Sequence, residues 1–470
     1  MARAKKEAAL TPEERLQAAL VPDWEWPYKL PENWCWTRIG NYVDYVTDYV
    51  ANGSFASLKA NVSIFKDENY ALMVKTQDFA NGFTKSLTYT DKHGYDFLSK
   101  STLHGGELIL SNIGSVGKVF RVPYFDRPMT LASNSVMVKC YNSRDYDWMY
   151  YFLLSPIGFE ELKSITTGTA VPKFNKTDLK TIPLPVPPLA EQQRIVDRIE
   201  SLFAKLDEAK EKAQAVVDSF ETRKAAILHK AFTGELTAKW REEHGVGMES
   251  WEQCSISDVC TVNPKKADTK DLPDELEVSF FPMPALSEIY GEITDPQTRL
   301  LKEVRSGFTN FSEGDVVFAK ITPCMENGKS AVVGKLVNDI GYGTTEFFVL
   351  RCSDRLYNRF LYHLVRDKLF RDKAKAVMAG AVGQQRVPKR YLETYKLNLP
   401  KFNEQREIVR ILDGSFAKEQ QTKEAAEAVL DQIDLMKKSI LARAFRGELG
   451  TNDPNEESAV ELLKRGLEKK

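Results

Sequence analysis

Few residues in this sequence stand at spacings that support catalysis. Gly328-Lys329-Ser330 matches the end of a phosphate-binding loop, but that motif needs a glycine five residues before Gly328, and Pro323 occupies the position. No methyltransferase-like Asn-Pro-Pro-aromatic or Asp-Pro-Pro-aromatic tetrapeptide is present. None of the histidines shows H-E-x-x-H or H-x-E spacing: His93, His104, His229, His244 and His363. We therefore expect no catalytic residue, no cofactor site and no metal site in this chain.

The cysteines are equally scattered. There are six, and none forms a C-x-x-C pair: Cys35, Cys140, Cys254, Cys260, Cys324 and Cys352. This spacing fits neither a structural zinc site nor a compact disulfide framework. Reduced thiols and a cytoplasmic location are expected.

The chemistry that the residues do suggest is hydrogen bonding to nucleic acid. Between Val365 and Lys401 there are ten Lys/Arg and three acidic residues, in a chain of formal net charge −1. Part of this run is explained equally well by the solvated face of a helix. Gln384, Gln385 and Arg386 are more specific, because Gln and Arg side chains pair bidentately with adenine and guanine edges.

Thr166 to Asn175 is the corresponding segment of the first half, and its hydroxyls and lysine suit phosphate oxygens. The turns at Gly114–Gly117 and Asn327-Gly328 are either exposed punctuation or contact loops. An ordinary solvated loop remains the alternative for all of these segments. The predicted DNA-binding residues are Asn112, Ser115, Lys118, Thr167, Thr169, Lys173, Asn175, Lys320, Asn327, Lys329, Gln384, Gln385, Arg386 and Lys389.

A duplicated block must position these residues. Pro187 to Leu236, shifted by 213 positions, aligns with Pro400 to Leu449 without a gap, and about 22 of 50 positions are identical. The preceding segments correspond more weakly, with Trp34 matching Trp251 and Val171-Pro172-Lys173 matching Val387-Pro388-Lys389. The repeating unit is thus a globular region followed by a helix, and the globular regions have diverged more than the helices.

Both repeated blocks carry heptad patterns. Apolar residues alternate at steps of four and three, which predicts a long helix with an a/d seam in each block. In the first block they are Ile195, Ile199, Leu202, Leu206, Ala209, Ala213, Val216, Phe220 and Ile227. In the second they are Ile408, Leu412, Ala426, Val429, Ile433, Met436 and Ile440, around a polar middle of Ser415, Glu419 and Thr422.

Helix ends are marked by prolines and glycines. The first helix is expected to begin near Leu189, Asn403 is a plausible N-cap for the second, and Gly234 and Gly447 mark the C-termini. A helix of ~45 residues is about 65 Å long. The two helices either pair as a ruler or belong to an ordinary bundle, and the heptads leave parallel and antiparallel pairing open.

The globular regions are predicted to be mixed α/β or α+β. Strands are expected at 71–74, 107–110, 118–122, 135–139, 315–319, 330–333 and 346–351, with helical stretches at 147–154 and 359–377. The predicted divisions are an N-terminal extension with a short helix (1–30), two globular domains (31–186 and 249–400), the helix-bearing segments 187–248 and 401–450, and a tail with a short helix (451–470).

With these patterns in hand, the chain resembles the specificity subunits of Type I restriction–modification systems. The resemblance covers essentially the whole chain. It rests on the opening Leu30-Pro31-Glu32-Asn33-Trp34, the Pro-Leu-x-Glu-Gln entry at Pro188–Gln192, and the exit Phe232-Thr233-Gly234-Glu235-Leu236, followed by a second copy. The second entry, Pro400-Lys401-Phe402-Asn403-Glu404-Gln405, has one proline where the first has several.

The resemblance implies two target-recognition domains, each recognising one half of a split duplex target. The paired helices would form an antiparallel coiled coil that sets the spacer and docks two methyltransferase subunits. S-adenosylmethionine, ATP and Mg would belong to the methyltransferase and restriction/translocase partners, in the bacterial cytoplasm at the nucleoid. No membrane partner is expected. A protein–protein scaffold that binds no DNA, and a self-sufficient methyltransferase, are the alternatives.

Overall fold

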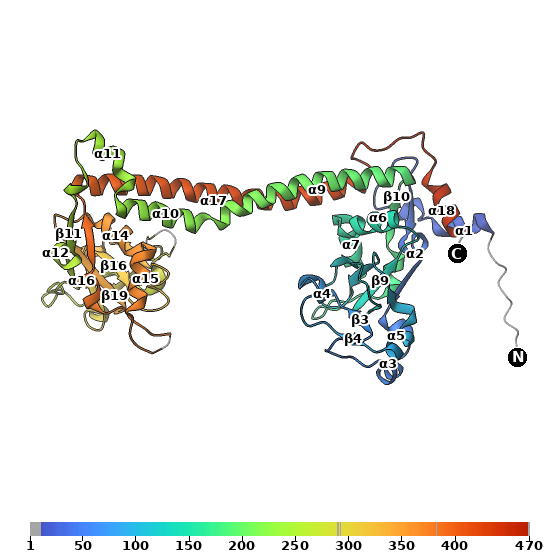
Figure 1. Ribbon diagram of the computed structural model, residues 1–470, viewed down its shortest axis with the longest axis horizontal. Helices are drawn as coiled ribbons and strands as arrows, with labels where there is room; N and C mark the ends of the chain where they lie inside the picture. The colour runs from blue at the N-terminus through green and yellow to red at the C-terminus, as the bar shows by residue number, and fades with distance from the viewer. Residues whose placement is uncertain (1–10, 289–290, 292, 382, 469–470) are drawn as a thin grey trace. The chain divides into compact units, whose positions relative to one another are not determined.

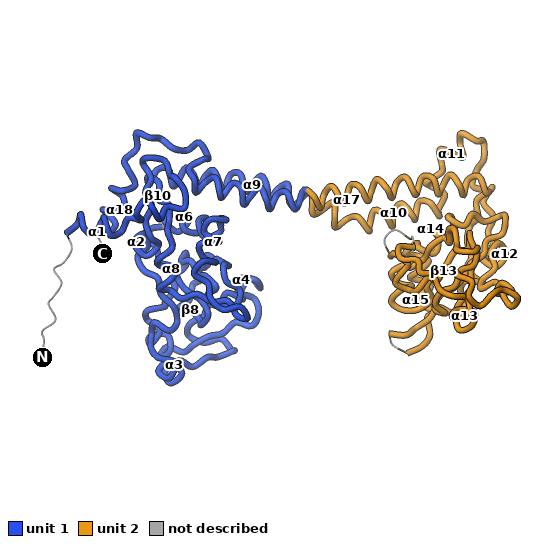
Figure 2. Tube along the Cα trace, turned by 180° about the vertical axis from the view of Figure 1, so that it is seen from behind, with its two compact units in different colours: residues 1–212, 429–470 blue, residues 213–428 orange. Residues whose placement is uncertain are grey.

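Two globular sets of sheets, one in each half of the chain, repeat the same topology strand for strand. The computed structural model describes residues 11–288, 291, 293–381 and 383–468. The chain forms two compact units: unit 1 comprises residues 1–212 and 429–470, and unit 2 comprises residues 213–428 (Figure 2). The fold class is mixed α+β, as predicted.

Unit 1 contains three small sheets, ordered β1-β10, β2-β9-β6-β7 and β4-β3-β8-β5, in which only the β3–β8 pair is parallel. Its strands are β1 Cys35–Arg38, β2 Tyr45–Asp48, β3 Ala71–Val74, β4 Tyr89–Thr90, β5 Thr102–Leu103, β6 Leu108–Ser111, β7 Val119–Arg121, β8 Met129–Leu131, β9 Ser135–Lys139 and β10 Pro183–Val186. Its short helices are α1 Pro12–Ala19, α2 Ile39–Tyr42, α3 Phe55–Asn61, α4 Thr76–Ala80, α5 Lys92–Phe97, α6 Ser143–Leu154, α7 Pro156–Ser164 and α8 Lys176–Thr181 (Figure 1).

Unit 2 has the equivalent sheets β11-β20, β12-β19-β16-β17 and β14-β13-β18-β15, with β13–β18 as the parallel pair. Its strands are β11 Glu252–Ser255, β12 Cys260–Val262, β13 Glu277–Phe281, β14 Gln297–Leu300, β15 Thr309–Phe311, β16 Val316–Ala319, β17 Ser330–Val332, β18 Gly341–Gly343, β19 Phe347–Cys352 and β20 Lys396–Leu399. Its short helices are α11 Ala238–Glu243, α12 Ile256–Val259, α13 Leu301–Val304, α14 Asn358–Arg366, α15 Lys368–Ala376 and α16 Lys389–Thr394.

The seven predicted strands all coincide with strands of the structure to within one or two residues. The central strands β6 and β16 are buried at every position. Such strands read as continuous apolar runs, which is why their sequence signal is strong.

The first long helix is interrupted, contrary to the prediction of one helix of about 45 residues. It consists of α9 Leu189–Asp218 and α10 Phe220–Thr233, separated at Ser219. The Ser219 hydroxyl donates to the Ala215 carbonyl at 2.6 Å, and the Arg223 guanidinium donates to the Val216 carbonyl. A serine that bonds back to the preceding turn bends a helix. The second helix, α17 Phe402–Ala444, is continuous over 43 residues.

Two other local expectations are corrected. Helix α17 begins at Phe402, so Asn403 lies inside the first turn and is not the N-cap. The predicted stretch 359–377 is two helices, because Asp367 ends α14 and its carboxylate accepts from the Phe370 N–H to cap α15. Gly234 does end α10 in the left-handed region, with φ 84°.

The two long helices pack together and run in opposite directions within unit 1. Lys210 pairs with Asp434 at 3.0 Å, and Lys437 pairs with Asp207. In unit 2, Arg223 of α10 forms an ion pair with Glu419 at 2.7 Å. Glu419 is one of the polar residues in the middle of the second seam, and this ion pair gives it a partner on the facing helix.

Eight of the sixteen predicted seam positions are buried, and most of the others are half-buried. Ile195, Ile199, Ala213 and Phe220 of the first block, and Ile408, Leu412, Ala426 and Ile433 of the second, are buried. Val429 and Met436 are 44% and 47% exposed, so the heptad pattern overstated the contact there.

Each globular region is tied to a long helix by the same pair of residue types. Trp34 Nε1 donates to Glu191 Oε2 at 2.8 Å in unit 1, and Trp251 Nε1 donates to Glu404 Oε2 at 3.0 Å in unit 2. The segment that follows the paired helix adds further donors. Asn452 binds Glu191 at 2.8 Å, and Arg241 binds Glu404 at 2.7 Å.

The predicted terminal helices are present and pack on each other. The N-terminal α1 lies against α18 Ala459–Leu467, and Lys464 is 3.6 Å from Glu13. Ala19 and Leu463 are buried in the core of unit 1. Residues 1–10 and 469–470 of the predicted terminal segments lie outside the described residues. Nowhere in the described part of the chain is a helix both long and apolar enough to cross a membrane.

Candidate nucleic-acid interface

In unit 1 the two predicted contact segments meet. The turn after β6 and the hairpin before α8 are joined by a β-bridge between Ile113 and Lys173. The Gly114 N–H donates to the Pro172 carbonyl at 2.9 Å, and the hairpin closes through a bridge between Thr167 and Lys173. Gly168 has φ +89°, a conformation that glycine adopts without strain.

Unit 2 joins its corresponding segments in the same way. Ile321 bridges Arg386, Arg386 bridges Ala379, and the Thr322 N–H donates to the Gln385 carbonyl at 3.0 Å. The Val387 N–H donates to the Lys320 carbonyl at 2.9 Å. Residues far apart in sequence thus form one polar surface in each unit.

The bridges establish which residues are equivalent, and they correct the sequence alignment. Lys173 corresponds to Arg386, since each bridges an isoleucine and its own hairpin partner. The Val-Pro-Lys matches are therefore out of register by three residues. The hairpin loops differ in length. Matching the Val-Pro-Lys motifs paired Lys173 with Lys389, whereas the structure pairs it with Arg386.

Several predicted side chains of unit 1 are exposed at this surface. Ser115, Lys118 and Thr169 are exposed, and their side chains make no hydrogen bond or ion pair within the described part of the chain. Two others serve the local fold. The Asn112 amide donates to the Phe174 carbonyl at 3.2 Å, and the Asn175 oxygen caps α8 by accepting from Thr177 and Asp178 N–H groups.

In unit 2, Arg386 is held by a carboxylate that the sequence analysis missed. Its Nε and Nη2 atoms lie 2.9 and 2.8 Å from the Glu346 oxygens, in a bidentate pair that is partly exposed. The hydrogen bonds from Arg386 lower the pKa of Glu346 and raise the pKa of Arg386 itself. Glu346 precedes β19 and carries no motif, so only the strand pairing places it opposite Arg386.

The remaining predicted residues of unit 2 divide into two groups. Gln384 is exposed and Gln385 half-buried beside Arg386, Lys320 lies over the Phe348 ring, and Lys389 pairs with Glu393 within α16. Asn327 and Lys329, in contrast, both contact Glu288, at 3.2 and 3.6 Å. Asn327 also lines a separate cavity under the helices.

This arrangement of exposed donors suits binding. Among the described residues, no group of three or more His, Cys, Asp or Glu side chains could hold a metal ion. All six cysteines are free thiols. The surfaces offer amides, hydroxyls, lysines and one clamped guanidinium, which are the donors used for phosphates and base edges.

Comparison with known proteins places the chain in a family. A family model for the Type I restriction modification DNA specificity domain matches residues 46–217 and again residues 248–429. The chain belongs to this family and contains two such domains.

Curated relatives agree with this assignment. The chain is 32% identical over 259 residues to the Type I restriction enzyme EcoEI specificity subunit of Escherichia coli, an alignment that covers 46% of this chain and 43% of the relative. It is 31% identical to the EcoAI specificity subunit of the same species, with 47% and 44% covered. The chain thus aligns with less than half the length of either relative. The MjaVIII specificity subunit of Methanocaldococcus jannaschii is 23% identical over 451 residues, with 91% and 95% covered.

Two solved structures share the fold. The HsdS subunit from Thermoanaerobacter tengcongensis superimposes with a TM-score of 0.56 at 20% identity, covering 90% of this chain and 99% of that one. A chain from a structural study of complex assembly and conformational transition of the type I R-M system gives a TM-score of 0.62 at 18% identity, covering 90% and 100%.

Proposed function

We propose that this chain is the DNA-recognition subunit of a bacterial Type I restriction–modification complex and has no catalytic activity of its own. Each unit would recognise one half of a split duplex target. The observation that carries this proposal is the repetition of one topology with two different surfaces. The hairpin around Lys173 presents hydroxyls, whereas the hairpin around Arg386 presents two glutamines and a guanidinium.

The two domains that we assign to the half-sites are residues 31–186 and 249–400. The fourteen predicted residues remain our proposed contacts, with those around Lys173 and Arg386 first among them. Asn327 and Lys329 are the weakest members, because both engage Glu288.

We further propose that the long helices form an antiparallel coiled coil that fixes the spacer between half-sites. The opposed ion pairs Lys210–Asp434 and Asp207–Lys437 and the buried a/d residues support this pairing. The same helices would dock two methyltransferase subunits, which would bind S-adenosylmethionine. Restriction subunits would supply ATP- and Mg-dependent chemistry, in the bacterial cytoplasm at the nucleoid.

A domain exchange tests the proposal. Residues 31–186 are replaced by the corresponding domain of another family member, and methylated adenines are mapped in cells that also contain the methyltransferase subunit. One half of the target should change and the other half should persist. A change in both halves would refute independent recognition by the two units.

A mobility-shift assay separates DNA recognition from the scaffold alternative. With the methyltransferase partner present, binding to duplex DNA should weaken steeply with salt, because neutralised phosphates release counterions. Absence of any shift at low salt, with the partner complex intact, would favour the scaffold.

A further inference from the structure

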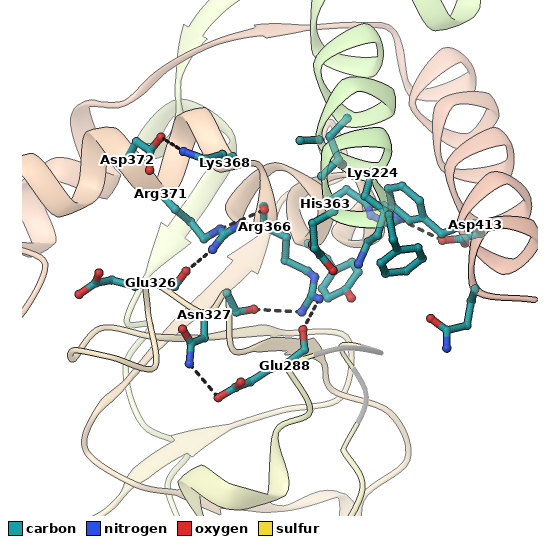
Figure 3. A pocket seen from close by; sticks show the side chains of 18 of the residues that line it. Lys224, Glu288, Glu326, Asn327, His363, Arg366, Lys368, Arg371, Asp372 and Asp413 are labelled. Atoms are coloured by element: carbon teal, nitrogen blue, oxygen red, sulfur yellow. Dashed lines mark hydrogen bonds and ion pairs between the residues drawn. The ribbon is translucent and has the colours of Figure 1, made fainter. Parts of the chain in front are cut away.

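Unit 2 contains a cavity of about 820 Å³, and Gln384, Gln385 and Arg386 are not among the residues that line it. Its walls are α10, α14, α15, α17 and the β16–β17 loop (Figure 3). A cavity of this size is in the range of small-molecule sites. Most of the carboxylates in its lining form ion pairs with lysine or arginine side chains.

Four of the five carboxylates that line the cavity form ion pairs with residues other than Lys224, Arg366 and Arg371. Lys368 pairs with Asp372 at 2.6 Å, Lys375 pairs with Glu326, and Arg359 pairs with Asp413 at 3.1 Å. Glu288 has Lys329 at 3.6 Å. Glu221 is the lining acid that has no ion pair among the described residues.

Lys224 and Arg371 are left without a carboxylate partner among the described residues. The Lys224 ammonium lies 5.2 and 5.6 Å from the Phe220 and Phe416 ring centroids. Arg371 donates to the backbone carbonyls of Arg366 and Glu326. Burial lowers the pKa of Lys224, the nearby Glu221 carboxylate partly opposes this, and repulsion from Arg366 and Arg371 adds to the lowering. Burial and Arg366 likewise lower the pKa of Arg371, more than the carboxylates of Asp372, Asp367 and Glu221 raise it. A bound anion would relieve this repulsion.

The internal repeat supplies a comparison for Lys224. The 213-residue shift aligns it with Lys437, which lies over the Phe203 ring as Lys224 lies over Phe416. Lys437 is neutralised by Asp207. The residue aligned with Asp207 is Gln420, an amide that lines the cavity and cannot neutralise Lys224.

The arginines are also specific to unit 2. Ser155 and Asp367 cap α7 and α15 in the same way, which aligns Leu154 with Arg366 and Phe159 with Arg371. The turn glycines agree with this register. A Cβ on Gly117 would meet the Phe159 ring, and one on Gly328 would meet the Arg371 guanidinium. Unit 1 therefore has apolar side chains where unit 2 has two guanidiniums.

From the juxtaposition of Lys224, Arg366 and Arg371 around the Asn327-Gly328 turn, together with the Asp207-to-Gln420 difference, we propose that this cavity binds a phosphate group and that unit 1 has no counterpart. Lys224 supplies the point charge and the Arg371 guanidinium supplies planar donors, while Arg366, which donates to the Gly328 and Glu288 carbonyls, adds positive charge beside them. The phosphate belongs either to a free phosphorylated small molecule or to the backbone of bound duplex DNA.

Calorimetric titration of the full chain with sodium pyrophosphate tests the site without DNA, and so independently of the proposed function. We expect saturable binding with a stoichiometry of one. Gln420→Asp should restore the ion pair seen in unit 1 and weaken binding about 10- to 100-fold, as expected for hydrogen bonds to charged groups. Lys224→Gln should also weaken pyrophosphate binding, because it removes the charge itself. The matched Lys437→Gln should leave pyrophosphate affinity unchanged.

Mobility shifts with duplex DNA then distinguish a phosphate of the DNA backbone from a phosphate of a small molecule. If the phosphate is that of DNA, Gln420→Asp should weaken target and unrelated duplexes by the same factor and lower the salt slope by about one. If it is that of a small molecule, DNA affinity stays constant while pyrophosphate binding is lost. Folded Gln420→Asp protein with unchanged affinity for both ligands, or wild-type protein that binds two pyrophosphates, would overturn the proposal.

Discussion

Arg241 Nη1 lies 2.7 Å from Glu404 Oε1 in a buried ion pair, with the two side chains 8% and 1% exposed. Arg241 belongs to α11, which follows α10, and Glu404 belongs to the first turn of α17. The equivalent carboxylate of unit 1, Glu191, accepts instead from the neutral donors Trp34, Asn452 and Thr451. One buried glutamate thus ties each globular region to a long helix, with a cationic partner in unit 2 alone.

Substituting Arg241 by alanine should destabilise unit 2 strongly. Glu404 would remain buried with its charge uncompensated, and breaking a buried pair by removing one partner costs about 3–5 kcal/mol. Denaturant unfolding of the full chain measures the effect. Lys239→Ala is the matched control on the same helix, because Lys239 is 87% exposed and its pair with Glu243 is a surface contact. Similar small losses for both variants would contradict the role of Arg241.

Unit 2 should lose stability in mild acid through His363. This histidine is buried, with Nε2 3.0 Å from Asp413 Oδ1, and burial lowers its pKa from the ordinary 6.5 despite the opposing carboxylate. The folded state therefore binds a proton less readily than the unfolded state. The stabilisation is complete above pH 6.5 and declines as the pH falls below it.

Burial raises the pKa of Asp413, but hydrogen bonds from His363 and Arg359 outweigh it and lower the pKa overall. Its contribution is lost only in stronger acid, below its ordinary 3.8. Unfolding midpoints at pH 7.5 and 5.5 should thus differ more for the wild type than for His363→Gln. The exposed His93→Gln variant should retain the wild-type difference. An equal pH effect in all three proteins would exclude His363 as the cause.

Releasing Arg386 from Glu346 should strengthen DNA binding. The bidentate pair occupies the guanidinium, so Glu346→Gln makes it available and removes a negative charge from the surface. Arg386→Ala should have the opposite effect. If Arg386 contacts a guanine, its loss costs about 1–3 kcal/mol and relaxes one base position.

Lys173→Ala, at the equivalent position of unit 1, provides the comparison. A lysine on phosphate should weaken all sequences uniformly and reduce the salt slope by about one. Quantitative mobility shifts on a panel of single-base target variants measure both effects. If Arg386→Ala lowered affinity without changing base preference, a phosphate contact would replace the proposed base contact.

Shortening the helix pair should shorten the DNA spacer. Removing residues 204–210 and 434–440, which face each other through Lys210–Asp434 and Asp207–Lys437, deletes one heptad from each helix and keeps the seam in phase. Seven residues are about 10 Å of helix, or roughly three base pairs at 3.4 Å each. Target mapping with the methyltransferase partner reads out the spacer. A functional variant with an unchanged spacer would argue that the helices do not measure it.

Local patterns in the sequence were sufficient for the repeat, the central strands, the start of α9 and the end of α10. Continuous apolar runs at β6 and β16, the prolines before Leu189 and the glycine at 234 each act over a few residues, and all lie where they were predicted. Ser219 was missed because its backbone bond competes with a strong helical pattern on both sides. The alignment of the two Val-Pro-Lys motifs was wrong because the two hairpin loops differ in length, and local propensity does not constrain loop length.

The chain's own order of residues determined that one fold occurs twice and that its two copies carry different polar side chains. Only the tertiary structure decided which of those side chains meet. The pairing of Arg386 with Glu346, the pairing of Arg241 with Glu404, and the placing of Lys224 and Gln420 in one cavity all join residues at least 40 positions apart. Such contacts depend on strand pairing and helix packing, and these are set by the burial of the whole core and by no motif within it.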